Sequence, residues 1–265
     1  MMPSAPTARA RLSIGILTKN EARLIEACVR SALFADEVIV LDSGSTDNTV
    51  ALAQALGARV CTSEDWQGFA VQRNRLLSQA TGEYIFFLDA DEVITPELRQ
   101  ELESIVARQE RCVWSVRWTV VAYGHTLHHF KSGASMERLF PRALIDHYEG
   151  VVHEEAILTQ AGVPRRTLEH RLLHHSRQSI RASLEKLTQY AMLGAAKRHA
   201  KGKQGGILRG FASALASFLR TYVAQRAFMD GGPGFLYCLF VALECFFRYV
   251  ALKYDRQQLT GTIAR

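Results

Sequence analysis

The sequence predicts an α/β fold in which a mostly parallel sheet is flanked by helices and followed by a helical C-terminal appendage. Short apolar runs alternate with amphipathic stretches through residues 12–107, which is the pattern of strand–helix–strand units. Residues 113–173 have strand-like pieces joined by turns, and the residues from 179 onward have helical spacing. A chain of 265 residues is long enough for one substantial domain with such an appendage.

The elements of the first half follow one another in a regular order. Apolar runs predict strands over residues 12–17, 38–41, 59–61 and 84–88. Amphipathic spacing predicts helices over residues 21–33, 48–56 (N-capped by Ser45 or Thr46), 69–80 and 96–107 (with proline in the first turn). Ligands of such sheets lie at the carboxyl ends of the strands, so we expect chemistry just after residues 17, 41 and 88.

The second half changes character after residue 112. Strand-like pieces are predicted over residues 113–121, 138–142, 151–157 and 167–173. Helices are predicted over residues 179–199, 207–229 and 235–254. The Asp-Gly-Gly-Pro-Gly segment 230–234 is predicted to break the chain between the last two helices.

Charge is distributed unevenly along the chain. The net charge of +6 divides into −6 for residues 1–163 and +12 for residues 164–265. An acidic front indicates a carboxylate-rich chemical site, and a basic back indicates a surface that meets an anionic partner, either nucleic acid or anionic lipid. The five cysteines form no CxxC pair, which is typical of reduced thiols in a cytosolic protein. The N-terminus lacks the apolar stretch of a signal peptide.

Three polar clusters follow the predicted strands, at residues 18–21, 42–48 and 89–92. Asp89 and Asp91 stand two residues apart at the end of an apolar strand, so both carboxylates can converge on one hard cation such as Mg²⁺ or Mn²⁺. Such a metal can bridge a diphosphate and neutralise charge on a leaving group. The alternative interpretation of this pair is a solvated turn.

The cluster at residues 42–48 predicts an anion site. Asp42 ends a strand, Gly44 lets the backbone turn, and the next helix points its N-terminus at the same edge of the sheet. Asp42 could accept hydrogen bonds from a nucleobase or a ribose. The alternative for this cluster is a capped loop.

Several motifs occur in a characteristic order between residues 12 and 92. They are Ile-Leu-Thr-Lys-Asn-Glu at 16–21, Val-Ile-Val-Leu-Asp-Ser-Gly-Ser-Thr-Asp at 38–47, Gln-Arg-Asn at 72–74, Gly-Glu-Tyr-Ile at 82–85 and Phe-Leu-Asp-Ala-Asp-Glu at 87–92. The ordered set resembles the family 2 inverting glycosyltransferases, which have the GT-A type of Rossmann-like fold. The resemblance implies a metal-dependent enzyme with a nucleotide-sugar donor.

The resemblance also implies roles for individual residues. The nucleotide-sugar site would be formed by Thr18, Asn20, Glu21, Asp42, Ser45, Asp47, Arg73, Asn74, Asp89 and Ala90. Asp89 and Asp91 would hold a divalent metal, Mg²⁺ or Mn²⁺, and Asp91 would take part in catalysis. His174 or His175 would close over the diphosphate. The pairs His125/His129 and His170/His174 are spaced for a metal only on a helix, and we expect strand or loop there.

The second half narrows the resemblance. Glu-Arg-Leu-Phe at 137–140, followed by Gly-Val-Val-His-Glu at 150–154 and a long basic tail, is similar to the branch that builds bacterial lipopolysaccharide core, in particular its β-1,4-glucosyltransferases. This similarity implies transfer of a hexose, glucose by resemblance, from a UDP-sugar to a lipopolysaccharide-core glycolipid. A related transferase acting on capsule, exopolysaccharide or a lipid phosphate is the main alternative.

An inverting transfer needs a carboxylate to take the proton of the acceptor hydroxyl. The family commonly places it in a Glu-Asp pair, where this chain has His153, Glu154 and Glu155. Alternation along residues 151–157 puts Glu154 on one face and its neighbours on the other, which favours Glu154 as the base. The opposite register would leave Glu155.

The C-terminal region is predicted to lie on a membrane surface or to bind the acceptor. Apolar residues recur at helical spacing over 207–223, and the uninterrupted apolar run 235–243 is far shorter than the ~20 residues that span a bilayer. We therefore expect no spanning helix. The helices could simply pack together, or present an amphipathic face to an anionic membrane, helped by Lys197, Arg198, Lys201, Lys203, Arg209 and Arg220.

These expectations divide the chain into a disordered lead-in (1–11), a GT-A catalytic domain (12–175) and a basic helical region (176–265). The enzyme is expected in the cytoplasm, peripheral on the cytoplasmic face of the inner membrane. A nucleotidyltransferase would carry a Gly-rich basic loop after the first strand, which residues 18–22 do not form. A non-catalytic protein that binds nucleic acid or lipid through the tail is the alternative of another class, and no nucleic-acid motif supports nucleic acid as a partner.

Overall fold

The computed structural model describes residues 11–150, 154–257 and Leu259, so the predicted lead-in lies outside it except for Arg11. The chain forms two compact units. The first comprises Met1–Trp118 and Gly133–His174, and the second comprises Thr119–Ser132 and His175–Arg265. The division after His174 is one residue from the predicted boundary, but Thr119–Ser132 joins the helical unit, because Val120 and Ala122 pack there with Ala227 and Cys238.

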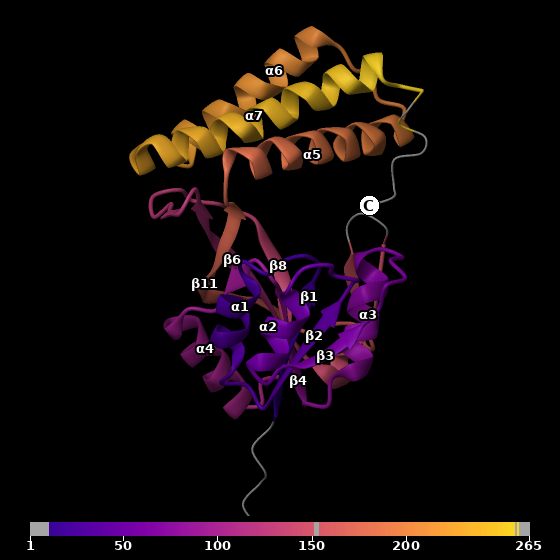
Figure 1. The fold of residues 1–265 in the computed structure, drawn as a ribbon, viewed down its shortest axis with the longest axis vertical. Helices are drawn as coiled ribbons and strands as arrows, with labels where there is room; N and C mark the ends of the chain where they lie inside the picture. Colours follow the sequence, from indigo (N-terminus) through magenta and orange to yellow (C-terminus); the bar gives the residue numbers. More distant parts are fainter. Residues whose placement is uncertain (1–10, 151–153, 258, 260–265) are drawn as a thin grey trace, which may run out of the picture. The chain divides into compact units, whose positions relative to one another are not determined.

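A parallel sheet forms the centre of the first unit (Figure 1). Its strands run in the order β3 (Arg59–Thr62), β2 (Glu37–Asp42), β1 (Leu12–Thr18) and β4 (Tyr84–Asp89). All seven residues of β1 are buried, as expected for a parallel strand whose two faces are both covered. The predicted mostly parallel α/β fold is confirmed.

Helices cover both faces of this sheet. α1 (Ile25–Ala32), α2 (Thr49–Ala55) and α4 (Pro96–Ala107) supply side chains to one apolar cluster, together with the side chains of β1 that point to that face. α3 (Phe69–Gln79) packs on the opposite face through Ala70 and Leu76. Thr95 caps α4 by accepting the backbone N–H of Leu98 at 3.2 Å, and proline stands in the first turn.

Antiparallel strands extend the sheet beyond β4. β8 (Ser135–Pro141) pairs antiparallel with β4, and the order continues through β6 (Val113–Ala122) and β11 (Arg165–Arg177) to β5 (Glu92–Val93). β9 (Ile145–Glu149) and β10 (Glu155–Leu158) form a separate two-stranded sheet, and β7 (His125–Thr126) pairs with β6. The sequence did not predict β5, β7 or β9, because each is too short or too polar to give a periodic signal.

The C-terminal helices of the second unit are α5 (Ile180–Ala200), α6 (Ile207–Phe218) and α7 (Gly231–Tyr254). α6 continues as a π-helix, Leu219–Ala224, and a 3-10 helix, Ala227–Asp230, precedes α7. The predicted break at residues 230–234 is confirmed at Gly231, whose φ of 63° and ψ of −145° separate this 3-10 helix from α7, although the residues after it are already helical. A second turn lies at Arg226, whose φ of 63° is left-handed, and Pro233 stands in the first turn of α7, where its missing N–H costs little.

One stretch of the second unit, Ala227–Tyr254, is long and apolar enough to cross a membrane by length and composition alone. The expectation of no spanning helix stays a prediction, because length and composition alone do not show that this stretch crosses a membrane. It rested on the run 235–243, but the helix tolerates Glu244 and Arg248 within an otherwise apolar sequence. Glu244 is ion-paired with Arg177 inside the second unit.

Candidate active site

The loop after β2 is organised by Asp42, which is almost completely buried. One carboxylate oxygen accepts the backbone N–H groups of Gly44 and Ser45, at 3.0 and 2.9 Å, and the other accepts the Ser45 hydroxyl. Gly44 has a φ of 82°, which a glycine adopts without strain. The predicted capping of α2 by Ser45 or Thr46 is wrong, because Ser45 serves Asp42 and the N-cap residue is Asn48, without a side-chain cap.

The loop after β1 is tied to the loop after β2. The Asn20 backbone N–H donates to the Ser45 hydroxyl at 2.8 Å, and the Asn20 side-chain oxygen accepts the backbone N–H of Thr46 at 2.8 Å. Asp47 accepts the backbone N–H of Ala22 at 3.1 Å. The structure therefore brings together the predicted nucleotide residues of these two loops.

Two further residues of this edge have distinctive surroundings. The Thr18 hydroxyl is buried and has no hydrogen-bond partner among the described residues. A buried hydroxyl without a partner costs free energy unless a ligand or water satisfies it, which fits a ligand-facing position. The Glu21 backbone N–H donates to the Thr49 hydroxyl at 2.8 Å, which fixes the start of the following turn.

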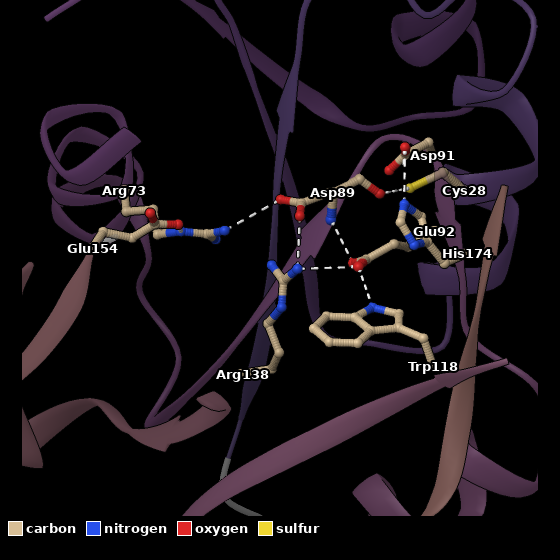
Figure 2. Close-up of polar contacts among 9 residues, drawn as sticks. All are labelled: Cys28, Arg73, Asp89, Asp91, Glu92, Trp118, Arg138, Glu154 and His174. Carbon is tan, nitrogen blue, oxygen red and sulfur yellow. Dashed lines mark hydrogen bonds and ion pairs between the residues drawn. The ribbon is translucent and has the colours of Figure 1, made fainter. Parts of the chain in front are cut away.

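Asp89 lies at the end of β4 between two arginines (Figure 2). Its Oδ1 is 3.3 Å from Nη2 of Arg73, and its Oδ2 is 2.6 Å from Nη2 of Arg138. Loss of water contact favours the neutral acid, but Arg138 and Arg73 outweigh it and hold the pKa of Asp89 well below its usual range. Asp89 is thus ionised, and both of its oxygens are engaged by guanidinium groups.

Behind Asp89 lies a buried polar cluster that the sequence did not reveal. Nη2 of Arg138 also contacts Glu92 at 3.0 Å, and Glu92 accepts the indole N–H of Trp118 at 2.5 Å (Figure 2). Arg138 is 1% exposed and Glu92 is 2% exposed. Burial raises the pKa of Glu92, and the carboxylates of Asp89 and Glu92 raise the pKa of Arg138 against the effect of its burial. In the sequence, the buried cluster could have been suspected only from Arg138, a charged residue that precedes the apolar residues Leu139 and Phe140 in a predicted strand.

Arg73 connects this cluster to the candidate base. Its Nε is 3.1 Å from Oε1 of Glu154, while Nη2 contacts Asp89. Its Nη1 is buried and has no hydrogen-bond partner among the described residues. The neighbouring Asn74 exchanges hydrogen bonds with the backbone of Tyr148, at 2.9 and 2.6 Å, and so holds β9 against α3.

A cavity of about 330 Å³ adjoins Arg73 and Glu154. It is lined by Arg73, Met136, Glu137, Tyr148, Glu154, Glu155, Ala156 and Arg165. The lining mixes carboxylates, guanidinium groups and an aromatic side chain, which suits a ligand rich in hydroxyl groups. Both candidate bases line it. Residues 151–153, including His153, lie outside the described residues, so the predicted strand is seen only as β10, Glu155–Leu158.

Asp91 faces a histidine of β11. Its Oδ2 is 3.3 Å from Nε2 of His174 (Figure 2). Neighbouring ligands of an octahedral ion with bonds of ~2.1 Å stand roughly 3 Å apart, so this pair fits a divalent metal. Both carboxylate oxygens of Asp89, the other predicted metal ligand, contact arginines. Between the two aspartates, the backbone N–H of Ala90 donates to the Leu17 carbonyl at 3.3 Å. Among the described residues, no group of three or more His, Cys, Asp or Glu side chains could hold a metal, so a substrate would have to complete the coordination.

His129 and His170, one member of each predicted histidine pair, have exposed side chains at the surface. His129 contacts Asp230 and His170 contacts Glu101, each at 3.0 Å. As expected, His125 and His170 lie in strands and His129 lies in a loop, rather than in a helix.

Comparison with known proteins connects this geometry to a family. Residues 13–171 match the protein family described as "Glycosyl transferase family 2". An "Uncharacterized glycosyltransferase" of Rickettsia bellii (strain RML369-C) is 28% identical over 92% of this chain and 86% of its own length. The "Lipopolysaccharide core biosynthesis glycosyltransferase LpsC" of Rhizobium meliloti (strain 1021) is 27% identical over 98% of this chain and 96% of its own length.

Among solved structures, glucosyl-3-phosphoglycerate synthase from Mycobacterium tuberculosis, in complex with Mn²⁺, UDP and glucosyl-3-phosphoglycerate, matches with a TM-score of 0.47. It is 22% identical, and the match covers 69% of this chain and 76% of that chain. The family match spans more than half of the chain and includes β1, β4 and the clusters at their carboxyl ends. The chain therefore belongs to glycosyl transferase family 2.

Proposed function

We propose that this glycosyltransferase is metal-dependent and inverting, and that it moves a hexose from a UDP-sugar to a lipopolysaccharide-core glycolipid. The observation that carries the proposal is the position of Arg73, whose guanidinium contacts both Asp89 and Glu154 beside a cavity. One side chain thus links the carboxylate cluster of the expected donor site to a carboxylate that can take a proton. The LpsC relative supports the acceptor class, and glucose is proposed from the sequence resemblance.

In this proposal the acceptor lies in the cavity with its hydroxyl directed at Glu154. The hydroxyl oxygen attacks the anomeric carbon of the donor and its proton passes to the Glu154 carboxylate. The bond from the anomeric carbon to the diphosphate breaks, and the nucleotide diphosphate leaves with the electron pair. Inversion follows because attack and departure take place on opposite faces of the sugar.

The remaining residues would position the donor. The loops organised by Asp42, Asn20 and Asp47 would hold the nucleoside, with the Thr18 hydroxyl as one contact, and Arg73 would direct its unpartnered Nη1 at the diphosphate. Asp91 and His174 would hold Mn²⁺ or Mg²⁺, with Asp89 beside them. When bound there, the ion would neutralise charge on the leaving diphosphate.

We further propose that transfer takes place on the cytoplasmic face of the inner membrane. The five cysteines form no disulfide in the part of the chain that the structure describes, which suits a reducing compartment. A glycolipid acceptor requires contact with a membrane, whereas a UDP-sugar is a soluble donor.

The donor site is tested by calorimetry with UDP-glucose, other UDP-sugars and GDP-mannose, each with and without Mn²⁺. We expect one UDP-sugar to bind in a Mn²⁺-dependent manner, and Asp91→Asn to weaken that binding by about tenfold or more, because a neutral amide is a poor ligand for a hard cation. Mn²⁺ alone should bind weakly, since two protein ligands do not fill an octahedral shell.

The matched control is Asp146→Asn. Asp146 also contacts a histidine, His147 at 2.8 Å, but both side chains are exposed on β9, so this substitution should leave donor binding unchanged. A donor affinity that changes neither with Mn²⁺ nor with Asp91→Asn would contradict the metal site. Failure of every donor to bind would contradict the transferase proposal itself.

A further inference from the structure

Exposed apolar side chains are concentrated in the second unit. Within the described residues, every exposed large apolar side chain except Leu33 and Met136 belongs to that unit. Isolated exposed apolar residues are normal on a soluble protein, but a contiguous apolar patch marks an interaction surface. The surface of the first unit therefore has only isolated exposed apolar side chains, whereas the second unit carries most of the exposed apolar side chains of the described residues.

Five of these side chains, including the three most exposed, form one row along α6 and the π-helix that follows it. Leu208 is 85% exposed, Phe211 60%, Leu215 61%, Leu219 50% and Val223 52%. Steps of three or four residues place consecutive members on the same face of a helix. We define these five residues as the α6 row.

The opposite side of α6 packs on α7, and within the row the Phe211 ring also contacts the Phe246 ring of α7, with ring centroids 4.8 Å apart. Gly210, Ser217 and Thr221 are buried, and α6 lies along α7 (Figure 1). A Cβ atom at Gly210 would stand 2.9 Å from the Phe246 carbonyl oxygen of α7. The helix therefore packs mainly through small residues on one side, while the large apolar residues on its other side remain at least half exposed.

The charge around the row has one sign. No Asp or Glu occurs from residue 186 to residue 229. The basic side chains of this stretch are Lys186, Lys197, Arg198, Lys201, Lys203, Arg209, Arg220 and Arg226. Of the next two carboxylates, Asp230 accepts the backbone N–H groups of His129 and Phe130, and Glu244 pairs with Arg177. The carboxylates are thus used internally, while arginines next to the row, such as Arg209 and Arg220, are exposed.

We propose that the α6 row and its flanking basic residues dock this enzyme on an anionic lipid bilayer, lying in the membrane interface rather than crossing it. An exposed apolar stripe bordered by basic residues is the pattern of an interfacial helix, which buries its apolar face at the headgroup–acyl boundary. Attraction to anionic headgroups supplies the remaining affinity. A protein partner with an acidic, apolar groove would be a different occupant, and the test separates the two.

The interfacial placement also accounts for α7, which has the length and composition of a spanning helix. α7 lies beside both α5 and α6 and carries Glu244, ion-paired with Arg177, within its length. A membrane-spanning α7 would carry this charged pair into the hydrocarbon, where charged side chains are rare and costly. In the interface, the pair stays within the protein and α6 alone meets the lipid.

The test is co-sedimentation of the full chain with vesicles of phosphatidylglycerol and phosphatidylcholine in equal parts, over a salt series, against vesicles of phosphatidylcholine alone. The protein should bind the anionic vesicles at low salt and at least tenfold more weakly as salt rises. The double variant Phe211→Gln/Leu215→Gln should bind at least about tenfold more weakly at every salt concentration. The matched control is Leu33→Gln, which removes an apolar side chain that is 47% exposed on the first unit and should bind as the unchanged chain does.

A second measurement places the helix in the bilayer. Phe211→Trp should be quenched by lipids brominated near the headgroup more than by lipids brominated near the chain ends, whereas Leu33→Trp should be quenched by neither. Stronger quenching by the deep bromines would overturn the interfacial placement, and absence of binding, or equal binding to neutral vesicles, would overturn the membrane proposal. Self-association of the chain in solution that the Phe211→Gln/Leu215→Gln variant abolishes would identify the row as a protein interface instead. UDP-sugar binding by the Phe211→Gln/Leu215→Gln and Leu33→Gln variants serves as a check of folding and is independent of each outcome.

Discussion

Glu154→Gln is expected to lower kcat by about 10²- to 10⁴-fold while leaving the affinity for the UDP-sugar nearly unchanged. The amide cannot take the acceptor proton, so the nucleophile must attack without general-base assistance. The substitution keeps an oxygen that can accept the N–H of Arg73, which lies 3.1 Å from Glu154 Oε1 in the structure. The contact between Arg73 and Asp89 should therefore persist, and the loss should be confined to turnover.

The measurement is steady-state kinetics together with donor calorimetry, and Glu155→Gln is the matched control. Both residues line the cavity, but the ion pair with Arg73 is made by Glu154. Glu155→Gln should retain most of the activity. If instead the Glu155 variant loses turnover and the Glu154 variant keeps it, Glu155 is the base and Glu154 only positions Arg73.

Arg138→Met is expected to lower the free energy of unfolding by about 3–5 kcal/mol, the effect of removing one partner of a buried ion pair. Arg138 is almost completely buried, and its guanidinium contacts both Asp89 and Glu92. Without it, Glu92, which is 2% exposed, loses the guanidinium group that contacts it at 3.0 Å. Asp89 has 35% of its side chain exposed and retains Arg73, so most of the cost should come from Glu92.

Urea unfolding of the purified chain measures this loss. Arg165→Met is the matched control, because Arg165 pairs with Glu137, the neighbour of Arg138 on β8, but is 57% exposed. Exposed pairs contribute about 0–1 kcal/mol, so this control should change little. Adding Glu92→Gln to Arg138→Met should restore part of the loss, because it removes the unpaired charge. Equal effects of Arg138→Met and Arg165→Met would contradict the assignment.

The central part of the fold follows from local patterns in the sequence. The apolar strands 12–17, 38–41 and 84–88 and the helices between them form as expected, because each strand is an apolar run and each helix an amphipathic one, although α1 begins at Ile25 rather than at residue 21. Parallel pairing then brings the carboxyl ends of β1, β2 and β4 to one edge. This explains why the contacts of Asn20 with the loop that Asp42 organises could be anticipated.

The cluster around Arg138 could not be anticipated, because long-range antiparallel pairing creates it. Trp118 belongs to β6, Arg138 to β8 and His174 to β11, and none of these strands has a local signal that fixes its neighbours. The extent of the break after residue 229 was also missed. The chain turns at Gly231, as a glycine–proline segment predicts, but residues 232–234 already belong to α7 and a second turn lies at Arg226.

The close approach of α6 and α7 limits which substitutions the second unit can accept. A methyl group at Gly205 would lie 2.3 Å from the Tyr249 carbonyl oxygen, and one at Gly210 would lie 2.9 Å from that of Phe246. Backbone atoms cannot move aside as a flexible side chain does, so in a saturation library these two positions should accept almost nothing but glycine. The α6 row, by contrast, should accept any large apolar residue. The segment from Gly205 to Val223 would then have one face on which two positions accept only glycine and another on which many apolar residues are accepted. The pattern of tolerated changes would distinguish its packing face from its docking face.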